Sequence, residues 1–117
     1  MKEKVTHLSH VPQEKVEMEG VRDAYIQWLI SDKDGAPNFA MRRFIVKAGG
    51  YTPFHHHPYE HEVLILSGKG QVIIGNNAYD VHSGSVVFVP PDVMHQFRNS
   101  GNGDLEFICV IPNLPKK

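Results

Sequence analysis

The chain has 117 residues, enough for one domain with its own core and too few for two. Hydrophobic residues make up 41% and charged residues 21%, a composition typical of folded globular proteins and unlike that of disordered chains. The chain has 12 basic and 13 acidic residues, a net charge of −1. This balance excludes bulk electrostatic attraction to nucleic acid or to an anionic membrane.

Short runs rich in Val, Ile, Phe and Tyr alternate with Gly and Pro along the chain. Residues 1–20 are charged and patternless, and we expect an N-terminal arm or an edge strand there. Strands are predicted after them, over 24–30, 39–47, 60–67, 71–74, 78–81, 85–89, 94–99 and 105–111. Regular short strands with turns between them favour an all-β sandwich or barrel, with few helices, in a single domain spanning 1–117.

Eight histidines are an unusual number, and four of them lie between positions 55 and 61. If this segment is extended, His55 and His57 share one face while His56 points away. His61 then faces inward on the following strand, and Glu62 faces outward. Three imidazoles on one side could hold a metal such as Zn, Cu, Fe or Ni. A surface loop that merely contains histidines is the alternative interpretation.

The spacing of these residues resembles the two sequence motifs of the cupins, and the motifs together cover 49–99. The first motif reads, with gaps of five, one, three and six residues, Gly49, His55, His57, His61 and Gly68. The second follows after fifteen residues and reads, with gaps of five, one, two and three residues, Gly84, Pro90, Asp92, His95 and Asn99. Two positions depart from the family pattern: His61 stands where cupins have Glu, and Asp92 stands where they have Gly. Asp tolerates a left-handed turn, so the second change is structurally mild.

The resemblance implies an antiparallel jelly-roll β-barrel, the double-stranded β-helix, with a metal inside. It assigns His55, His57 and His95 as metal ligands, and His61 takes the place of the family's carboxylate ligand. Either His61 is a fourth ligand or it is an inward core histidine beside a three-ligand site. The cofactor expected is one divalent transition metal ion per chain, whether Fe, Mn, Ni, Zn, Co or Cu.

Three further residues are candidates for substrate binding. Phe97 shares the parity of His95 and should face the interior. A core aromatic is the favoured interpretation, and a residue that lines the substrate site is the second. Tyr59 lies between the ligand clusters, where the mouth of the barrel is expected. One of two neighbouring arginines should point inward and bind a carboxylate. We favour Arg43, because the odd positions from 39 to 45 would then form the inward-facing side of this strand. The opposite phase, with Arg42 inward, fits nearly as well.

These features favour a metal-dependent enzyme, dioxygenase-like or a Lewis-acid isomerase or lyase, acting on a small organic acid or sugar-like molecule. A non-catalytic metal-dependent binding or sensing module is the alternative, and a purely structural metal is a third. Glu60 and Glu62 should both face outward, so no carboxylate is expected to act as a general base.

Partners and location follow from the same observations. We expect a small-molecule ligand and a homodimer that pairs through the strand at 24–30, with Tyr25 and Trp28 in the interface. The single Cys109 cannot form an internal disulfide, and no apolar run reaches the ~18 residues of a membrane span, so a cytoplasmic location is expected.

Overall fold

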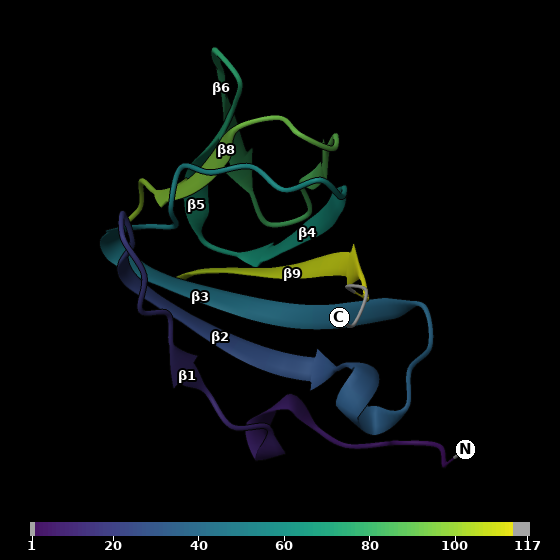
Figure 1. Ribbon diagram of the computed structural model, residues 1–117. Helices are drawn as coiled ribbons and strands as arrows, with labels where there is room; N and C mark the ends of the chain where they lie inside the picture. Colours follow the sequence, from purple (N-terminus) through teal and green to yellow (C-terminus); the bar gives the residue numbers. More distant parts are fainter. Residues whose placement is uncertain (1, 114–117) are drawn as a thin grey trace.

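The computed structural model describes residues 2–113, and in that range nine antiparallel strands curl around one interior (Figure 1). The strands are β1 (Glu14–Lys15), β2 (Arg22–Ile30), β3 (Phe39–Tyr51), β4 (His61–Ser67), β5 (Lys69–Ile74), β6 (Asn77–His82), β7 (Val86–Val89), β8 (His95–Asn99) and β9 (Leu105–Pro112). Two short 3₁₀ turns, η1 (Leu8–His10) and η2 (Asp32–Asp34), complete the described elements. Between residues 2 and 113, no helix has both the length and the apolar character needed to cross a membrane.

The strand order confirms the predicted jelly-roll. Hydrogen-bonded neighbours follow the order β6-β5-β8-β3-β9-β4-β7, and β2 pairs with β3 on one side and with β1 on the other. The long strand β3 belongs to both layers: Phe39 to Val46 pair with β9, whereas Tyr51 pairs with Arg98 of β8. In Figure 1 the layer of β5, β6 and β8 lies above the layer of β2, β3 and β9, and β4 closes the side between them.

Strand β3 extends four residues beyond its expected end at Lys47, because two glycines that read as a turn lie inside the strand. Gly49 has φ 78°, a conformation that L side chains rarely adopt. At Gly50 a Cβ atom would lie 2.6 Å from the Arg22 carbonyl oxygen, so only glycine fits there. The pair therefore lets the strand bend from one layer into the other without ending it.

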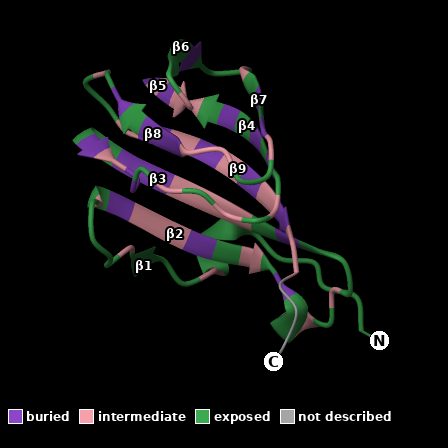
Figure 2. Ribbon diagram, turned by 45° about the horizontal axis from the view of Figure 1, so that its top comes forward, coloured by how far each residue is buried: buried purple, intermediate pink, exposed green. Residues whose placement is uncertain are grey.

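The interior is filled by alternate side chains of every long strand (Figure 2). Its largest fully buried members are Phe107, Ile65, Leu105, Val46, Val72 and Val89. Phe107 stacks on Phe97 with 4.5 Å between ring centroids and on Phe44 with 5.2 Å. This apolar packing is the main favourable term in folding a domain of this size, because apolar area is removed from water.

The N-terminal segment is fastened to β2. Its strand β1 pairs Glu14 with Ile26, and the Val16 amide donates to the Ala24 carbonyl oxygen at 2.9 Å. The buried amide of Gln27 donates to the carbonyl oxygens of Leu8 and Val11, both at 2.9 Å. The first residues of the chain thus lie against the outer side of β2.

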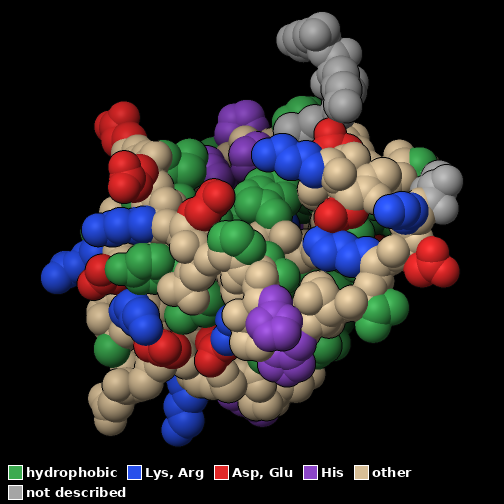
Figure 3. Space-filling model, turned by 90° about the horizontal axis from the view of Figure 1, so that it is seen from below, with side chains coloured by type: hydrophobic (Ala, Val, Ile, Leu, Met, Phe, Trp, Pro, Cys, Tyr) green, Lys and Arg blue, Asp and Glu red, His purple; other side chains and the backbone are tan. Residues whose placement is uncertain are grey.

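A tight hairpin turn joins β5 and β6. Ile74 pairs with Asn77, which leaves Gly75 and Asn76 as a two-residue loop, and Gly75 has φ 60°. On the molecular face in Figure 3, basic and acidic side chains are interspersed, as the balanced composition suggests.

Candidate functional site

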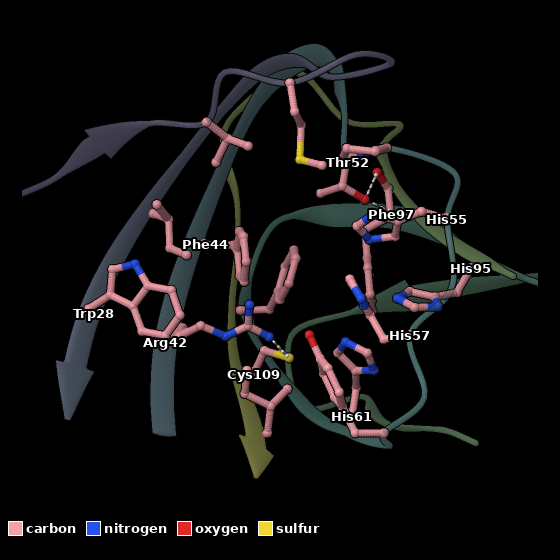
Figure 4. Close-up of a pocket in the computed structure, with 17 residues that line it drawn as sticks. Trp28, Arg42, Phe44, Thr52, His55, His57, His61, His95, Phe97 and Cys109 are labelled. Atoms are coloured by element: carbon pink, nitrogen blue, oxygen red, sulfur yellow. Dashed lines mark hydrogen bonds between the residues drawn. The ribbon is translucent and has the colours of Figure 1, made fainter. Parts of the chain in front are cut away.

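A cavity of about 370 Å³ lies inside the barrel (Figure 4). Its lining comes from β2, β3, β4, β8 and β9, from the segment 52–59, and from two residues of the N-terminal segment, Val16 and Met18. Four histidines form one wall, and Arg42 lies on the opposite wall beside Trp28 and Cys109. Both predicted motifs therefore contribute to a single pocket.

The histidine wall is assembled from three separate segments. His55 and His57 follow Thr52 in an extended segment, whereas His61 begins β4 and His95 begins β8. The His55 and His95 backbones form a two-way bridge, with N–H···O distances of 3.2 and 2.8 Å. The predicted alternation is confirmed: His55 and His57 are half-buried on the pocket side, and His56 between them is exposed.

The four imidazole rings are close neighbours. Centroid separations are 4.4 Å for His55 and His57, 5.2 Å for His55 and His95, and 4.6 Å for His61 and His95. His57 lies 5.4 Å from His61 and 6.1 Å from His95. Asp92, with φ 66° as expected for this turn, donates its amide to the His57 carbonyl oxygen at 2.7 Å and so holds the segment that carries His55 and His57.

Two ring nitrogens define the hydrogen-bonding state of this wall. The Nδ1 atom of His95 lies 3.0 Å from the Val93 carbonyl oxygen, so Nδ1 carries the proton and donates it. That tautomer leaves a lone pair on Nε2. The Nδ1 atom of His61 is buried and has no hydrogen-bond partner within residues 2–113.

Burial lowers the pKa of all four imidazoles, because the interior disfavours the charged form. Desolvation first, and neighbouring imidazoles and Arg42 second, lower the pKa of His61 to about 3. The same order of causes lowers the pKa of His55 to about 4. Desolvation also lowers the pKa of His57 and of His95. At neutral pH the wall therefore offers four neutral rings with free lone pairs.

The donor chemistry of this wall suits a transition metal. Neutral imidazole nitrogens suit Zn, Fe, Ni or Cu, whereas Mg and Ca require oxygen ligands. The side chains themselves are not drawn together around a common point: in residues 2–113 no three His, Cys, Asp or Glu groups are arranged closely enough to hold an ion. Ring separations and donor type thus suit a transition metal, although the described side chains do not point to one common centre.

The opposite wall centres on Arg42. Its Nη2 donates to the Cys109 sulfur at 3.0 Å, and its guanidinium carbon lies 5.0 Å from the Phe44 centroid and 5.5 Å from the Trp28 centroid. Burial raises the pKa of the Cys109 thiol despite this cation. The thiol is therefore neutral at pH 7 and a weak acceptor for Arg42.

The structure corrects the favoured phase of the arginine pair. Arg42 lines the pocket, and Arg43 lies on the outer face, where it donates to the Gln27 Oε1 atom at 2.6 Å and forms an ion pair with Glu106. The favoured inner row is wrong because Phe39 and Met41 are exposed, 65% and 38% respectively. Exposed apolar side chains on the outer face had made that face look like the interior.

The other candidates lie where the sequence placed them. Phe97 is buried and lines the pocket, and Tyr59 is half-buried with its ring stacked on His57 at 4.8 Å. Burial raises the pKa of the Tyr59 hydroxyl, so it keeps its proton at neutral pH. Glu60 and Glu62 are exposed, as expected. Whether Phe97 and Tyr59 contact a substrate stays a prediction.

Trp28 and Cys109 were not anticipated as site residues, and Arg42 was expected in the pocket only as the less favoured phase. They are cross-strand neighbours, because Trp28 pairs with Arg42 between β2 and β3, and Arg42 pairs with Cys109 between β3 and β9. Strand register brings them together, and the sequence carries no local signal for that register.

Comparison with known proteins agrees with this geometry. The family model described as Cupin domain matches residues 42–111. The polyketide cyclase RemF from Streptomyces resistomycificus superimposes with a TM-score of 0.89 and 29% identity, covering 95% of this chain and 80% of that one. A cupin 2 conserved barrel domain protein from Rhodopseudomonas palustris has a TM-score of 0.80 and 33% identity, covering 96% of this chain and 80% of its own.

A curated enzyme is also similar in sequence. The 1-methylthio-D-xylulose 5-phosphate methylsulfurylase of Rhodospirillum rubrum is 32% identical over 81 residues, which are 64% of this chain and 52% of that enzyme. The chain spans about half the length of the first curated relatives that it matches. Similar proteins therefore include enzymes of quite different named substrates.

Proposed function

This chain belongs to the cupin family, and we propose that it is a metal-dependent enzyme acting on a small organic acid. The observation that carries the proposal is that four neutral imidazoles line one wall of the cavity as close neighbours, opposite a single cation. A pocket that joins buried donor groups to room for a ligand is the usual form of a small-molecule site.

We propose His55, His57, His61 and His95 as the ligands of one divalent transition metal ion. Histidines that share an ion have ring centroids roughly 4.5–6.5 Å apart, given a metal–nitrogen distance of about 2.1 Å. The separations of 4.4–6.1 Å between these rings support a four-histidine site with little rearrangement of the backbone. The unpartnered Nδ1 of buried His61 further supports the four-ligand alternative over an inert core histidine.

When bound, such an ion would supply a Lewis acid and, for Fe or Cu, a redox centre. The chain's own residues have separate roles. The Val93 carbonyl holds the His95 ring and its proton in place, and Arg42 presents positive charge across the cavity. Tyr59 keeps its proton beside His57 and can donate it to a ligand. The aromatic walls keep water from the space between them.

A non-catalytic binding or sensing module is the second candidate. One observation favours it: among the described residues, no Asp or Glu lines the cavity, so a protein carboxylate is not in place as general base. Lewis-acid or oxygen chemistry needs no such base, and both therefore stay within the proposal.

Elemental analysis of untagged protein tests the proposal, followed by an oxygen-uptake screen with small acids and diketones. One equivalent of Fe or Cu with substrate-dependent uptake supports a dioxygenase. One equivalent of Zn, Ni, Co or Mn without uptake supports Lewis-acid chemistry or binding. Protein that takes up no metal even after reconstitution overturns the metal site.

The homodimer through the strand at 24–30 stays a prediction: Trp28 lines the cavity and is still 42% exposed. The outer face of β7 and β4 is a second candidate interface, because it carries exposed apolar side chains, among them Val86, Phe88 and Leu64. Light scattering of the wild type and of Phe88→Glu checks this: a dimer that becomes monomeric supports that face.

A further inference from the structure

We propose that Arg42 is the anion-binding residue of the cavity and that the aromatic rings around it select a planar, conjugated carboxylate as the ligand. The inference rests on the proposed function only in placing the ligand in this cavity. It does not depend on which metal binds, or on whether one binds.

The charge of Arg42 has no counterpart in the protein. Within residues 2–113, Arg42 is the one charged side chain that lines the cavity at neutral pH, and it belongs to none of the ion pairs there. Its Nε atom is buried without a hydrogen-bond partner, as is that of Arg43, but its one side-chain hydrogen bond goes to the neutral sulfur of Cys109. A half-buried guanidinium without a carboxylate beside it is a favourable place for an anionic ligand.

The neighbouring arginine shows that this state is specific to the cavity. Arg43 carries the same charge one residue along the same strand, yet it has an ion pair with Glu106 and a hydrogen bond to Gln27. The sheet thus supplies a carboxylate to the outer guanidinium and only a neutral sulfur to the inner one. The inner guanidinium is free to bind a ligand carboxylate through two parallel N–H donors.

The rings around Arg42 define the rest of the ligand. Trp28 and Phe44 flank the guanidinium, and the stacked pair Phe97 and Phe107 lies deeper in the same cavity. Aromatic walls of this kind bind flat conjugated bodies by offset or edge contacts. A carboxylate on such a body can reach Arg42 while the body itself lies in the cavity against these rings.

The same lining disfavours a sugar or sugar phosphate. The Thr52 hydroxyl is already engaged, because it accepts the Phe97 amide at 2.8 Å. Beyond Tyr59 and the histidines, the described lining offers few polar side chains for a ring of hydroxyl groups. Hydroxyls buried without hydrogen bonds lose affinity, so a polyol binds this cavity poorly.

Calorimetry with 2-naphthoate tests the proposal, on protein as purified and on protein stripped with EDTA. The matched neutral probe is 2-naphthamide, which has the same ring system without the charge. We expect 2-naphthoate to bind, and Arg42→Gln to weaken it at least tenfold while changing 2-naphthamide binding less than threefold. Arg42→Lys should keep part of the affinity because it keeps the charge. Arg43→Gln, on the other face, should bind 2-naphthoate like the wild type.

A second readout is built into the cavity. Trp28 is the single tryptophan of the chain, so its fluorescence should change on binding in the wild type and in Arg43→Gln. Circular dichroism of each variant establishes that it is folded; if Arg42→Gln does not fold, Arg42→Lys and the naphthoate–naphthamide comparison in the wild type carry the test.

Three results would overturn the inference. They are equal affinity of 2-naphthoate for the wild type and folded Arg42→Gln, equal affinity of the wild type for the two naphthalene probes, and tighter binding of glucose 6-phosphate than of 2-naphthoate. Metal content is measured on the same samples. If 2-naphthoate binding depends on Arg42 and the protein takes up no metal, this inference holds and the proposed metal site is wrong. If the protein binds metal but 2-naphthoate binding does not depend on Arg42, the metal site holds and this inference is wrong.

Discussion

The interior of this barrel changes character along its strands. At their first residues, β4 and β8 present His61 and His95 to the cavity, and further along they bury Ile65 and Phe97 in the apolar core. The first region holds buried nitrogens without partners and a cation without a carboxylate. The second is apolar, with Leu105 and its neighbours almost completely buried. Groups that are costly to bury are thus gathered at one end, and the other end supplies the packing that offsets them.

This division implies that stability and ligand chemistry can be changed separately. Leu105→Ala removes a fully buried side chain from the apolar end, and we expect a loss of about 3 kcal/mol in the free energy of unfolding. Urea denaturation measures it, with Leu105→Met as the volume-conserving control, expected to cost less than about 1.5 kcal/mol. Metal content per folded protein should not change. A Leu105→Ala protein that is folded but metal-free would show that the two ends are coupled.

The pH dependence of stability should originate at the histidine end. Burial lowers the pKa of His61 to about 3 and that of His55 to about 4, while the unfolded chain titrates near 6.5. Below pH 6.5 the unfolded state therefore binds more protons, so stability is full above that pH and falls as pH drops towards 4. For metal-free protein we expect His61 alone to contribute a loss on the order of 2 kcal/mol between pH 7 and pH 4.5.

Denaturation curves at several pH values check this, with His61→Gln as the variant that should flatten the profile. His82→Gln is the matched control, because His82 is exposed on β6 and should leave the profile unchanged. Identical profiles for wild type and His61→Gln would place the titrating groups elsewhere.

His95→Ala changes the histidine end of the barrel, where we expect metal binding to be affected more than stability. We expect it to abolish stoichiometric metal binding while costing only about 1 kcal/mol of stability, since the ring's one hydrogen bond goes to a backbone carbonyl. Plasma mass spectrometry of reconstituted protein measures the metal. His56→Ala is the matched control, because His56 lies in the ligand segment but is exposed. Full metal content in His95→Ala would exclude this residue as a ligand.

The smallest change is expected for His61→Glu, which restores the carboxylate of the family pattern. A carboxylate can coordinate in place of the imidazole, so the metal should be retained, with lower net charge at the site. Binding of 2-naphthoate to the metal-loaded protein should weaken by a few-fold, since that charge no longer assists Arg42. Loss of all metal in this variant would show that the geometry is specific to four histidines.

The fold was largely predictable, because alternation and turn residues act locally. Eight expected strands are present, and the resemblance to the cupin motifs implied the jelly-roll that the strand order shows. The end of β3 was misplaced because glycines at a bend inside a strand look like glycines in a turn. Gly50 is required by its close approach to the Arg22 carbonyl oxygen, a contact between residues distant in sequence.

The site was predictable only in part. The histidine wall follows from parity within short segments, and the structure places all four rings together. The opposite wall depends on the register of β2, β3 and β9, which no local pattern specifies. Arg42 was misjudged because both faces of β3 carry apolar residues, with Phe39 and Met41 outside and Phe44 and Val46 inside. When both faces of a strand are apolar, the sequence alone does not show which face points inward.

The labelling rate of Cys109 can report how often the barrel opens. It is the chain's single thiol, it is 2% exposed, and its raised pKa keeps it in the unreactive form. A disulfide reagent therefore modifies it only during moments when the barrel opens, and the labelling rate counts those moments. Since the thiol touches Arg42, a ligand held by that guanidinium should slow the count. One colorimetric labelling reaction on the unmodified chain can thus measure both the opening rate of the barrel and whether a ligand occupies its cavity.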